Sequence, residues 1–580
     1  MRILGLVSAT HDSGVALLEN GVPELVLEEE RLDRIKRTKR FPKGSLRIAL
    51  GPNLERLKEV DVITTPWDLS RLRWTFARAV FGRLPWSLSF LLQSSHTTQE
   101  NEIVLLNNVL RRKFRRQLGI TELPPIVNVS HHDAHAAIFF VSPFEEAAIL
   151  VMDGFGDDAS TSAYIGRGNR IERLWHTGIF NSLGIVYTFV TKYLGFNFSD
   201  EGKVMALAAF GGDTYVNAFR ELIRPTPDGR YQVNFDYFSY DAFGELRPFK
   251  RRFIETFGPP RLPGEELTDR HRDIARALQV VTEEIVLHMA RDLRLKTNAT
   301  KLCISGGVAL NCVANARVLE EAGFERVWVP PCASDTGAPL GSTLWHYHQT
   351  LGRPRCMELT HPYYGPTYSE KDIRDALAVA HLTGERLSEL ELLERVARDL
   401  AAGRIVGWFQ GRSEMGPRAL GNRSILADPR RAEMKDIINA RVKHREPFRP
   451  FAPAVLLERA SEFFHIDQPD PFMTLAPRVR EDKKHLIPAA VHVDGTGRIQ
   501  TVERSANPRY YGVIETFGKL TGVPVLLNTS FNQQEPIVET PSHAVSCFLR
   551  SGLDVLVLGN YYVTRNGQSR IVCDSNEVAT

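Results

Sequence analysis

A short histidine-rich run, residues 130–135, has the spacing of a metal site. His131 and His135 are four residues apart, so both imidazoles share one face of a helix and can bind a single metal ion. Asp153, which ends the next apolar strand, and Asp335, in a late acidic turn, are candidates for the remaining ligands. Two histidines with carboxylates suit iron, zinc or manganese better than calcium. An isolated pair of this kind is usually a polar surface helix, but the acidic turn that follows favours a metal.

Arginine and hydroxyl side chains gather in the last third of the chain. Residues 411–424 and 442–451 mix glycine, proline and arginine without helical periodicity, and residues 494–498 and 527–532 follow strand-like runs. Arginine donates paired hydrogen bonds to phosphate oxygens, while Ser, Thr and Asn add hydrogen bonds without charge. This inventory predicts a pocket for a nucleoside triphosphate or a small phosphorylated donor. RNA binding is the competing interpretation, weakened because the arginines lie in loops without an aromatic-and-basic stripe.

Two stretches about 140 residues apart repeat one order of elements. An apolar strand (3–7) leads through the acidic turn His11–Gly14 into two further strands, and residues 147–175 repeat this order. The repeat predicts a duplicated α/β fold of the actin and sugar-kinase type, with two plain hairpins as the alternative. A strand over 301–304 then runs into Gly306 and Gly307, where backbone amides could approach a phosphate.

Length and composition limit the classes of protein that remain. A chain of 580 residues needs at least two hydrophobic cores, and the proline-containing stretch 352–368 predicts domains at 1–360 and 361–580. The 72 basic and 69 acidic residues give a net charge of +3, which argues against a nucleic-acid binder. No apolar run is long enough for a membrane span, and the N-terminus does not fit a secretory signal. Six cysteines without a C-x-x-C pair predict reduced thiols in a cytoplasmic protein.

Eight motifs in order give the chain a family resemblance over nearly its whole length. It resembles the NodU/CmcH-type O-carbamoyltransferases of antibiotic and nodulation-factor biosynthesis. The motifs are His11–Ser13, Glu28–Arg31 with Lys36, His131–His135, Asp153–Asp157, Glu201–Leu207, Gly416–Gly421, Lys443–Phe451 and Asn528–Asn532.

The resemblance implies an α/β fold of two parts. The N-terminal part is expected to be an actin-like (ASKHA, duplicated ribonuclease-H-like) domain related to tRNA threonylcarbamoyl transferases, and the C-terminal part a YrdC-like α/β domain. In such relatives the C-terminal domain converts carbamoyl phosphate and ATP to carbamoyl-adenylate, releasing phosphate and pyrophosphate. The N-terminal domain then transfers the carbamoyl group to an acceptor hydroxyl, and AMP leaves. Enclosure protects an intermediate that hydrolyses readily.

The resemblance also assigns roles to particular residues. His11 is the candidate general base, since an imidazole titrates near neutral pH, and Lys36 would stabilise developing negative charge. The metal, with iron(II) as the predicted ion, would be held by His131, His135, Asp153 and Asp335, and Mg²⁺ would accompany ATP. The residues expected to bind the adenylate or the acceptor are Asp12, Lys203, Gly306, Gly307 and Asn311. Those expected to bind nucleotide and carbamoyl phosphate are Arg418, Arg423, Lys443, Arg449, Arg498, Asn528 and Ser530.

The expected partner is a small-molecule hydroxyl compound, with no nucleic acid and no membrane; a homodimer is left open. Acceptors in the family include aminoglycosides, cephems, ansamycins, polyketides, aromatic peptide antibiotics and lipo-chitooligosaccharides. The aromatic and basic segment 66–118 is interpreted as an acceptor-binding insertion or a dimer surface. A tRNA threonylcarbamoyl transferase is the first alternative, disfavoured by the balanced charge and by two domains in one chain. A non-catalytic binding module would not need both residue clusters, and a hydrogenase-maturation enzyme should carry zinc-finger cysteines.

Overall fold

A computed structural model describes residues 1–84, 86–88, 103 and 105–565. Residues 89–102 of the segment 66–118, and the last cysteine, Cys573, lie outside these described residues. The chain forms two compact units. Unit 1 comprises residues 1–364 with the short segments 415–417 and 472–477, and unit 2 comprises 365–414, 418–471 and 478–580.

The first sheet of unit 1 has the strand order β3-β2-β1-β4-β5. Its hairpin register pairs Gly5 with Ala16, and β1 pairs in parallel with β4. β2 and β3 are also antiparallel, and β4 and β5 are parallel. The strands are β1 (Arg2–Val7), β2 (Gly14–Glu19), β3 (Val22–Glu28), β4 (Val62–Thr65) and β5 (Ile126–Asn128). The apolar strands of this hairpin are buried on both faces, and one face lies in a core that contains Leu4, Leu17 and Ile63.

The second sheet of unit 1 repeats that topology, with the order β12-β11-β6-β7-β8. Again the first three strands in sequence are antiparallel neighbours, and the last two extend the sheet in parallel beyond the first. The strands are β6 (Glu146–Met152), β7 (Ala159–Arg167), β8 (Arg170–Gly178), β11 (Lys301–Ser305) and β12 (Arg326–Trp328). Two sheets of identical order confirm the predicted duplicated, actin-like ribonuclease-H fold.

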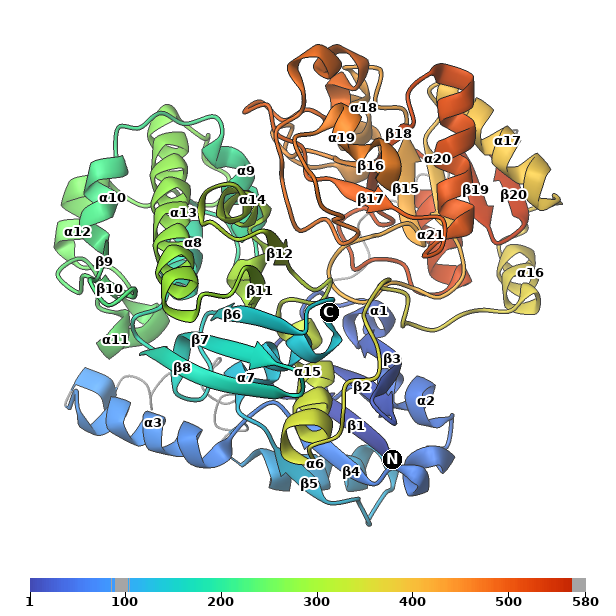
Figure 1. Ribbon diagram of the computed structural model, residues 1–580. Helices are drawn as coiled ribbons and strands as arrows, with labels where there is room; N and C mark the ends of the chain where they lie inside the picture. Colours follow the sequence, from blue (N-terminus) through green and yellow to red (C-terminus); the bar gives the residue numbers. More distant parts are fainter. Residues whose placement is uncertain (85, 89–102, 104, 566–580) are drawn as a thin grey trace. The chain divides into compact units, whose positions relative to one another are not determined.

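Helices in unit 1 bring loops from both sheets together (Figure 1). α7 (His131–Ala136) and the fully buried α15 (Ala338–Leu344) pack against each other, and α15 also packs on β1 and β2. Gly5 on β1 has no room for a side chain, because a Cβ would lie 2.1 Å from the carbonyl oxygen of Pro339. The longest helix is α13 (Asp269–Thr297), whose N-terminus is closed by a capping box at Thr268. The other helices and the small third sheet are α1 (Glu30–Asp33), α2 (Lys43–Leu50), α3 (Leu69–Phe81), α6 (Leu106–Lys113), α8 (Leu183–Tyr193), α9 (Glu201–Ala208), α10 (Val216–Leu222), α11 (Tyr240–Phe243), α12 (Arg251–Phe257), α14 (Cys312–Glu321), β9 (Ile223–Pro225) and β10 (Tyr231–Val233).

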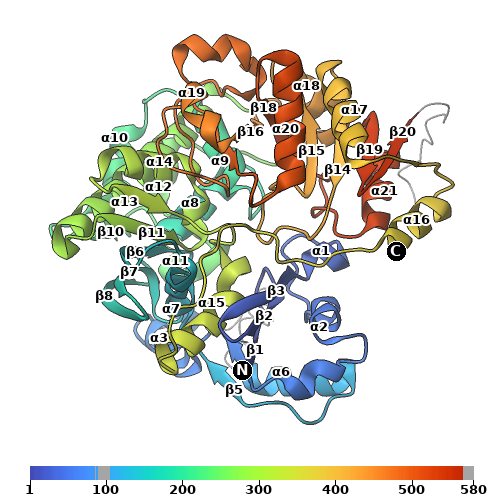
Figure 2. The same ribbon diagram turned by 45° about the vertical axis from the view of Figure 1, so that its right-hand side comes forward.

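Unit 2 is built on one mixed sheet of eight strands, in the order β13-β20-β19-β14-β15-β18-β16-β17. The strands are β13 (Glu385–Arg386), β14 (Val406–Phe409), β15 (Arg423–Ala427), β16 (Ala452–Leu456), β17 (Gln500–Val502), β18 (Val525–Ser530), β19 (Val555–Leu558) and β20 (Tyr561–Thr564). The helices are α16 (Glu370–Val379), α17 (Glu389–Ala401), α18 (Met434–Ile438), α19 (Ala460–Phe463), α20 (Pro508–Thr521) and α21 (Pro541–Arg550). α17 and α20 pack side by side over the sheet (Figure 2). Their apolar residues, including Tyr510 of α20, form a core cluster with the buried Trp408 of β14. The periodicity of residues 373–380 and 390–401 predicts the first two of these helices.

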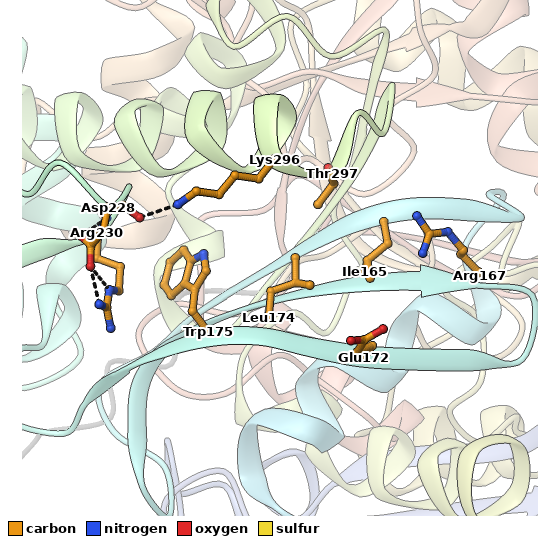
Figure 3. A pocket seen from close by; sticks show the side chains of 9 residues that line it. All are labelled: Ile165, Arg167, Glu172, Leu174, Trp175, Asp228, Arg230, Lys296 and Thr297. Carbon is orange, nitrogen blue, oxygen red and sulfur yellow. Dashed lines mark hydrogen bonds and ion pairs between the residues drawn. The ribbon is translucent and has the colours of Figure 1, made fainter.

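A pocket of about 500 Å³ lies in unit 1 beside β7, β8 and the end of α13 (Figure 3). Three of its charged residues contact one another: Lys296 donates to the carbonyl oxygen of Asp228 at 2.6 Å, and Arg230 donates to the Asp228 carboxylate. None of the residues predicted to carry chemistry lines this pocket. Among the described residues, no helix combines the length and apolar character needed to cross a membrane.

Candidate metal centre and anion-binding residues

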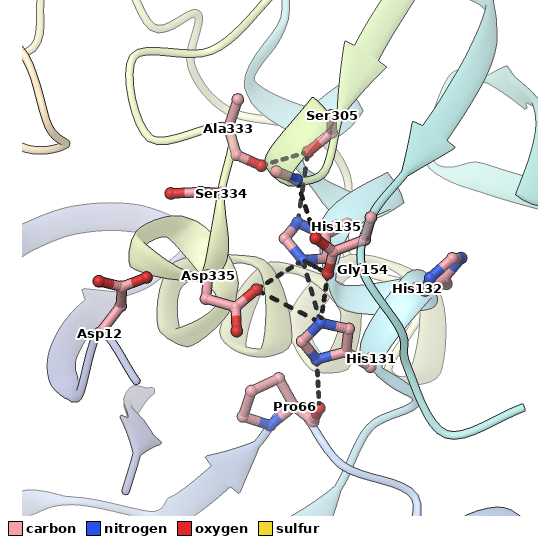
Figure 4. Close-up of polar contacts among 12 residues, drawn as sticks. Asp12, Pro66, His131, His132, His135, Gly154, Ser305, Ala333, Ser334 and Asp335 are labelled. Atoms are coloured by element: carbon pink, nitrogen blue, oxygen red, sulfur yellow. Dashed lines mark hydrogen bonds and ion pairs between the residues drawn. The ribbon is translucent and has the colours of Figure 1, made fainter. Parts of the chain in front are cut away.

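The four predicted metal ligands come together in unit 1 (Figure 4). One side-chain donor atom from each of His131, His135, Asp153 and Asp335 lies within 4.8 Å of all the others. The two Nε2 atoms are 3.3 Å apart, and that of His131 lies 3.0 Å from Asp153 Oδ2 and 3.4 Å from Asp335 Oδ1. Residues from α7, β6 and the turn before α15 thus converge on one point.

Helix α7 fixes the direction of both imidazoles. The helix begins at His131, whose backbone N–H donates to Asp157 Oδ2 at 2.7 Å, and the same carboxylate accepts from the backbone N–H of Asp68 at 3.0 Å. Ser130 occupies the N-cap position, but its side chain makes no capping hydrogen bond. His132 points away from the cluster, and its Nδ1 lies 2.8 Å from the Ser162 hydroxyl. The i, i+4 spacing therefore places the His131 and His135 imidazoles on one side of α7, as the sequence predicts.

A surrounding layer orients the ligand atoms. His131 Nδ1 lies 3.2 Å from the carbonyl oxygen of Pro66, an acceptor that requires this nitrogen to carry the proton. The next residue, Trp67, stacks on the His131 ring at 4.3 Å between centroids. The backbone N–H of Gly307 donates to Asp153 Oδ1 at 3.0 Å. These contacts leave His131 Nε2 and Asp153 Oδ2 directed at the centre of the cluster.

The charges inside the cluster depend on one another. Burial alone would lower the pKa of His131, but the carboxylates of Asp335 and Asp153 outweigh it and hold that pKa well above its usual value. His135 behaves in the same way, with its pKa raised by both carboxylates against burial. Burial would raise the pKa of Asp153, but the two imidazoles lower it well below the usual range. Both effects stabilise negative carboxylates beside protonated imidazoles, and a metal ion that binds here would take the place of those protons.

The donor set fits a divalent transition metal. Two ligands that are each about 2 Å from one ion lie about 3.3 Å apart at a tetrahedral angle, and the Nε2 atoms show this separation of 3.3 Å. Two neutral imidazoles and two carboxylates would also balance the charge of a divalent ion. When bound, such an ion supplies Lewis-acid stabilisation of negative charge on a phosphate or carbonyl oxygen.

In the metal-free protein, binding of a divalent cation at pH 7 should release protons, and the affinity should increase as the pH rises. The sign follows from the raised pKa values of His131 and His135, because below those values the imidazoles carry protons that the metal must displace. Calorimetric titration with Mn²⁺ in two buffers of different ionisation enthalpy measures the protons released. Mn²⁺ binding without proton release would contradict ligation by these imidazoles.

His11 and Asp12 lie on the β1–β2 turn beside the cluster. His11 Nδ1 is 3.0 Å from Asp12 Oδ2 and 3.7 Å from Asp335 Oδ2, and 33% of its side chain is exposed. Burial lowers the pKa of His11, but the Asp335 and Asp12 carboxylates raise it above the usual value. Ala9 and Asp12 have positive φ, so the turn is strained. The buried hydroxyls of Ser8 and Thr10 have no hydrogen-bond partner among the described residues, a feature that the sequence alone did not reveal.

The remaining residues predicted for the N-terminal part take varied positions. Lys36 is exposed, and Lys203 forms an ion pair with Asp200 at 3.2 Å. Asn311 caps α14 by accepting the backbone N–H of Ala314. At Gly306, φ is +91° and a Cβ would lie 2.2 Å from the carbonyl oxygen of Met152, so glycine is required. The amide of Gly307 is already used on Asp153, so in this structure the glycine pair shapes the metal cluster.

In unit 2, Lys443 is buried among neutral oxygen atoms. Its Nζ lies 2.5 Å and 3.2 Å from the backbone and hydroxyl oxygens of Ser530, and 2.9 Å and 2.7 Å from the backbone and side-chain oxygens of Asn532. These four acceptors carry no formal charge, and the ammonium group is only 1% exposed. These contacts hold the Lys443 side chain inside unit 2.

In unit 2, the positive charges of Arg449 and Arg498 act on the guanidinium group of Arg445. Burial and the nearby charges of Arg449 and Arg498 lower the pKa of Arg445. Arg445 donates to Asn439 Oδ1 at 2.8 Å and lies over the ring of Phe451. Glu446 acts in the opposite direction and raises the same pKa. Arginines grouped in this way are a candidate phosphate site. Sequence reasoning named two of its members and missed Arg445, although it lies in the same motif.

Two other predicted residues of unit 2, Arg423 and Asn528, donate hydrogen bonds to backbone carbonyl oxygens. Arg423 is fully buried, and its guanidinium donates to the carbonyl oxygens of Gln410, Asn422 and Glu539 while lying over the ring of Phe409. Those bonds occupy its donors within the fold of unit 2. Asn528 donates to the carbonyl oxygen of Ala419, the residue after the half-buried Arg418, and to Gln500 Oε1. The buried Oδ1 of Asn528 has no donor among the described residues.

The fold and the cluster define a protein with an actin-like unit that carries a metal-type centre and a second α/β unit that carries clustered cations. Family comparison agrees along the chain: a model described as carbamoyltransferase N-terminus matches residues 2–344, and one described as carbamoyltransferase C-terminus matches residues 397–565. The chain belongs to the carbamoyltransferase family and is an enzyme of that class, which confirms the predicted family.

Named relatives are similar over most of the chain. Nodulation protein NolNO of Sinorhizobium fredii is 39% identical, with 96% of this chain and 80% of the relative covered. Nodulation protein NolO of Bradyrhizobium diazoefficiens is 42% identical, with 76% of this chain and 80% of the relative covered. The 3'-hydroxymethylcephem-O-carbamoyltransferase of Amycolatopsis lactamdurans is 33% identical over 63% of this chain and 65% of its own.

Proposed function

We propose that this enzyme is an ATP-dependent O-carbamoyltransferase that acts on a hydroxyl group of a small-molecule natural product. Unit 2 forms carbamoyl-adenylate from carbamoyl phosphate and ATP, and unit 1 transfers the carbamoyl group to the acceptor. The observation that carries this proposal is the pairing of two chemistries in one carbamoyltransferase chain. One is the group of arginines around Arg445, which suits phosphates. The other is the cluster of two histidines and two aspartates that could hold a metal ion, with His11 beside it.

The first half-reaction is a phosphate-handling step that suits unit 2. Water cleaves carbamoyl phosphate to carbamate and phosphate, then a carbamate oxygen attacks the α-phosphorus of ATP and pyrophosphate leaves. In this proposal, Lys443, Arg449 and Arg498 neutralise the phosphate charges, together with Arg418. Arg445 lies within the influence of Arg449 and Arg498. Ser530 and the unfilled Oδ1 of Asn528 orient the donor. Mg²⁺ would accompany the nucleotide.

The second half-reaction needs a base, an electrophile and a place for the departing charge. The acceptor hydroxyl gives its proton to His11 as its oxygen forms a bond to the carbamoyl carbon, and the bond from that carbon to AMP breaks. Asp12 engages His11 Nδ1, which orients the ring and leaves Nε2 for the hydroxyl. The unpartnered hydroxyls of Ser8 and Thr10 suit the phosphate of the adenylate. Lys36, Lys203 and Asn311 supply the outer contacts, and iron(II) is the proposed ion at the metal centre.

Several observations support a small acceptor and an intracellular setting. The relatives named above include nodulation proteins and a cephem carbamoyltransferase. A net charge of +3 over 580 residues offers little to attract a nucleic acid. Five cysteines in the described part of the chain are free, and four of them are buried, which suits the reducing cytoplasm where ATP is available.

Replacing His11 by alanine should separate the two half-reactions. Pyrophosphate release should stay near the wild-type rate, while carbamoyl transfer falls about 10²- to 10⁴-fold, the usual effect of a general base. The assay follows label from [¹⁴C]carbamoyl phosphate into 3'-hydroxymethylcephem and chitooligosaccharides, with pyrophosphate measured in parallel. His176→Ala, an exposed histidine on β8, is the matched control. Equal loss of both activities in His11→Ala would sink this assignment.

A further inference from the structure

The motif Glu28–Arg31 has no role in the reaction proposed above, yet it supplies a buried ion pair to unit 1. Glu28 and Arg31 are only 5% and 2% exposed, and Arg31 Nε lies 3.5 Å from Glu28 Oε2. Burying two charges is costly unless their remaining hydrogen-bonding capacity is used. The partners that use it therefore indicate what the pair is for.

Two of those partners are the backbone groups of one residue, Gly416, from the short segment 415–417 that belongs to unit 1. Glu28 Oε1 accepts the backbone N–H of Gly416 at 2.7 Å, and Arg31 Nη2 donates to its carbonyl oxygen at 2.7 Å. A guanidinium donor and a carboxyl acceptor thus hold a single peptide position on both sides. Burial raises the pKa of Glu28 to about 7, against the lowering effect of Arg31 and of the Gly416 backbone N–H.

The position held in this way accepts only glycine. Gly416 has φ of +87°, and a Cβ there would lie 2.1 Å from the carbonyl oxygen of Pro331. The backbone of Gly416 is therefore packed directly on the loop that begins at Pro331. On its other side this loop is fixed at Ala333, whose carbonyl oxygen accepts from the Gly306 backbone N–H at 2.8 Å and from the Ser305 hydroxyl at 3.2 Å.

Each of the two segments joined here leads within a few residues to a group of the proposed reaction. The loop from Pro331 reaches the metal-cluster residue Asp335 four positions later. Gly416 precedes Arg418, the proposed phosphate-binding residue, by two positions.

We propose that Glu28 and Arg31 are positioning residues that set the metal centre and the adenylate-forming site together, by clamping Gly416 against the Pro331–Asp335 loop. The effect on the metal centre is inferred from the geometry of unit 1. The effect on the Arg418 segment rests on the proposed function. The pair touches no reacting group itself and acts through the two segments that it fixes.

The test compares Arg31→Met and Glu28→Gln with the wild-type enzyme. Both variants should weaken Mn²⁺ binding by about 10- to 100-fold, the range for loss of a residue behind a metal ligand. Both should also raise the KM for carbamoyl phosphate in pyrophosphate release more than they lower kcat. Arg31→Lys, which keeps the charge beside Glu28, should recover part of both effects. Arg270→Met is the control, since Arg270 also binds backbone carbonyls of unit 1, those of Phe257 and Pro259, away from either segment.

The possible outcomes separate the clamp from a general loss of stability and from the proposed function. Joint weakening of Mn²⁺ binding and of the donor KM, absent in Arg270→Met, supports the clamp. Unchanged Mn²⁺ affinity in folded Arg31→Met and Glu28→Gln overturns it, as does an equal loss in the control. If the wild type releases no pyrophosphate, the proposed function fails, and the Mn²⁺ titration still decides whether the pair positions the Asp335 loop.

Discussion

His131→Ala should lose the divalent metal and lower carbamoyl transfer by more than about 100-fold, the upper end of the effect of losing an outer partner of a metal ligand. His131 Nε2 faces both carboxylates and the second imidazole, so its removal takes away the donor that the other three surround. Metal content is measured by elemental analysis of protein loaded with iron(II), and transfer is measured with labelled carbamoyl phosphate. Pyrophosphate release should continue, because the proposed site for that step lies in unit 2.

The neighbouring His132 provides the control for this prediction. It belongs to the same short helix and is equally buried, but its ring is directed at Ser162. His132→Gln keeps a polar group for that hydroxyl and should retain the metal. If His131→Ala retained the metal at the wild-type level, the four-residue cluster would not be a metal site.

Arg449→Ala should lower pyrophosphate release about 10²- to 10³-fold, the usual effect of removing one donor that stabilises developing charge. The change should leave the affinity of the metal-free protein for Mn²⁺ unaltered, because Arg449 belongs to unit 2 and the four candidate metal ligands belong to unit 1. The change also removes one of the positive charges that lower the pKa of Arg445. Pyrophosphate release and thermal unfolding are measured on the same preparation.

Arg441→Ala is the matched control for Arg449→Ala. Arg441 lies in the same part of unit 2, but its guanidinium donates to Gly552 and Asp554 at the surface. Its loss should change pyrophosphate release less than about twofold, since exposed ion pairs contribute little. Comparable losses in both variants would show that the effect comes from general charge and would contradict a specific phosphate site.

The duplicated fold and the metal cluster could be predicted from sequence because both have local signatures. Apolar runs around two acidic turns indicate the two hairpins, and the i, i+4 spacing places His131 and His135 on one helical face. Asp153 and Asp335 each end an apolar strand or open a glycine-rich turn, the positions where chains converge in an α/β fold. The spacing of the two histidines and the positions of the two aspartates were therefore enough to predict the four residues of the cluster.

The layer around those ligands could not be predicted, because its contacts depend on tertiary packing. Pro66 and Trp67 lie far from His131 in sequence, and no pattern marks a carbonyl oxygen as a histidine partner. Asp157 belongs to a motif that the sequence singles out, but its role in fixing the start of α7 needs the fold. Gly307 is a similar case, since a glycine-rich turn does not reveal which group its amide will bind.

Arginine residues show the same limit in unit 2. A glycine- and proline-rich loop predicts cations for phosphate, yet Arg423 from such a loop is committed to backbone carbonyls in the core. Arg445, two residues from Lys443, lies among the clustered guanidinium groups that sequence reasoning assigned to its neighbours. Composition identifies the type of site, but only burial and partners decide which arginines are available to a ligand.

The most direct test of the two-step account uses the wild-type enzyme without an acceptor. The protein is incubated with ATP, Mg²⁺ and carbamoyl phosphate, and pyrophosphate, phosphate, AMP and ADP are followed. The account predicts pyrophosphate and phosphate in equal amounts, strictly dependent on carbamoyl phosphate, and no ADP. Absence of pyrophosphate, or release of ADP in its place, would contradict formation of carbamoyl-adenylate by this enzyme.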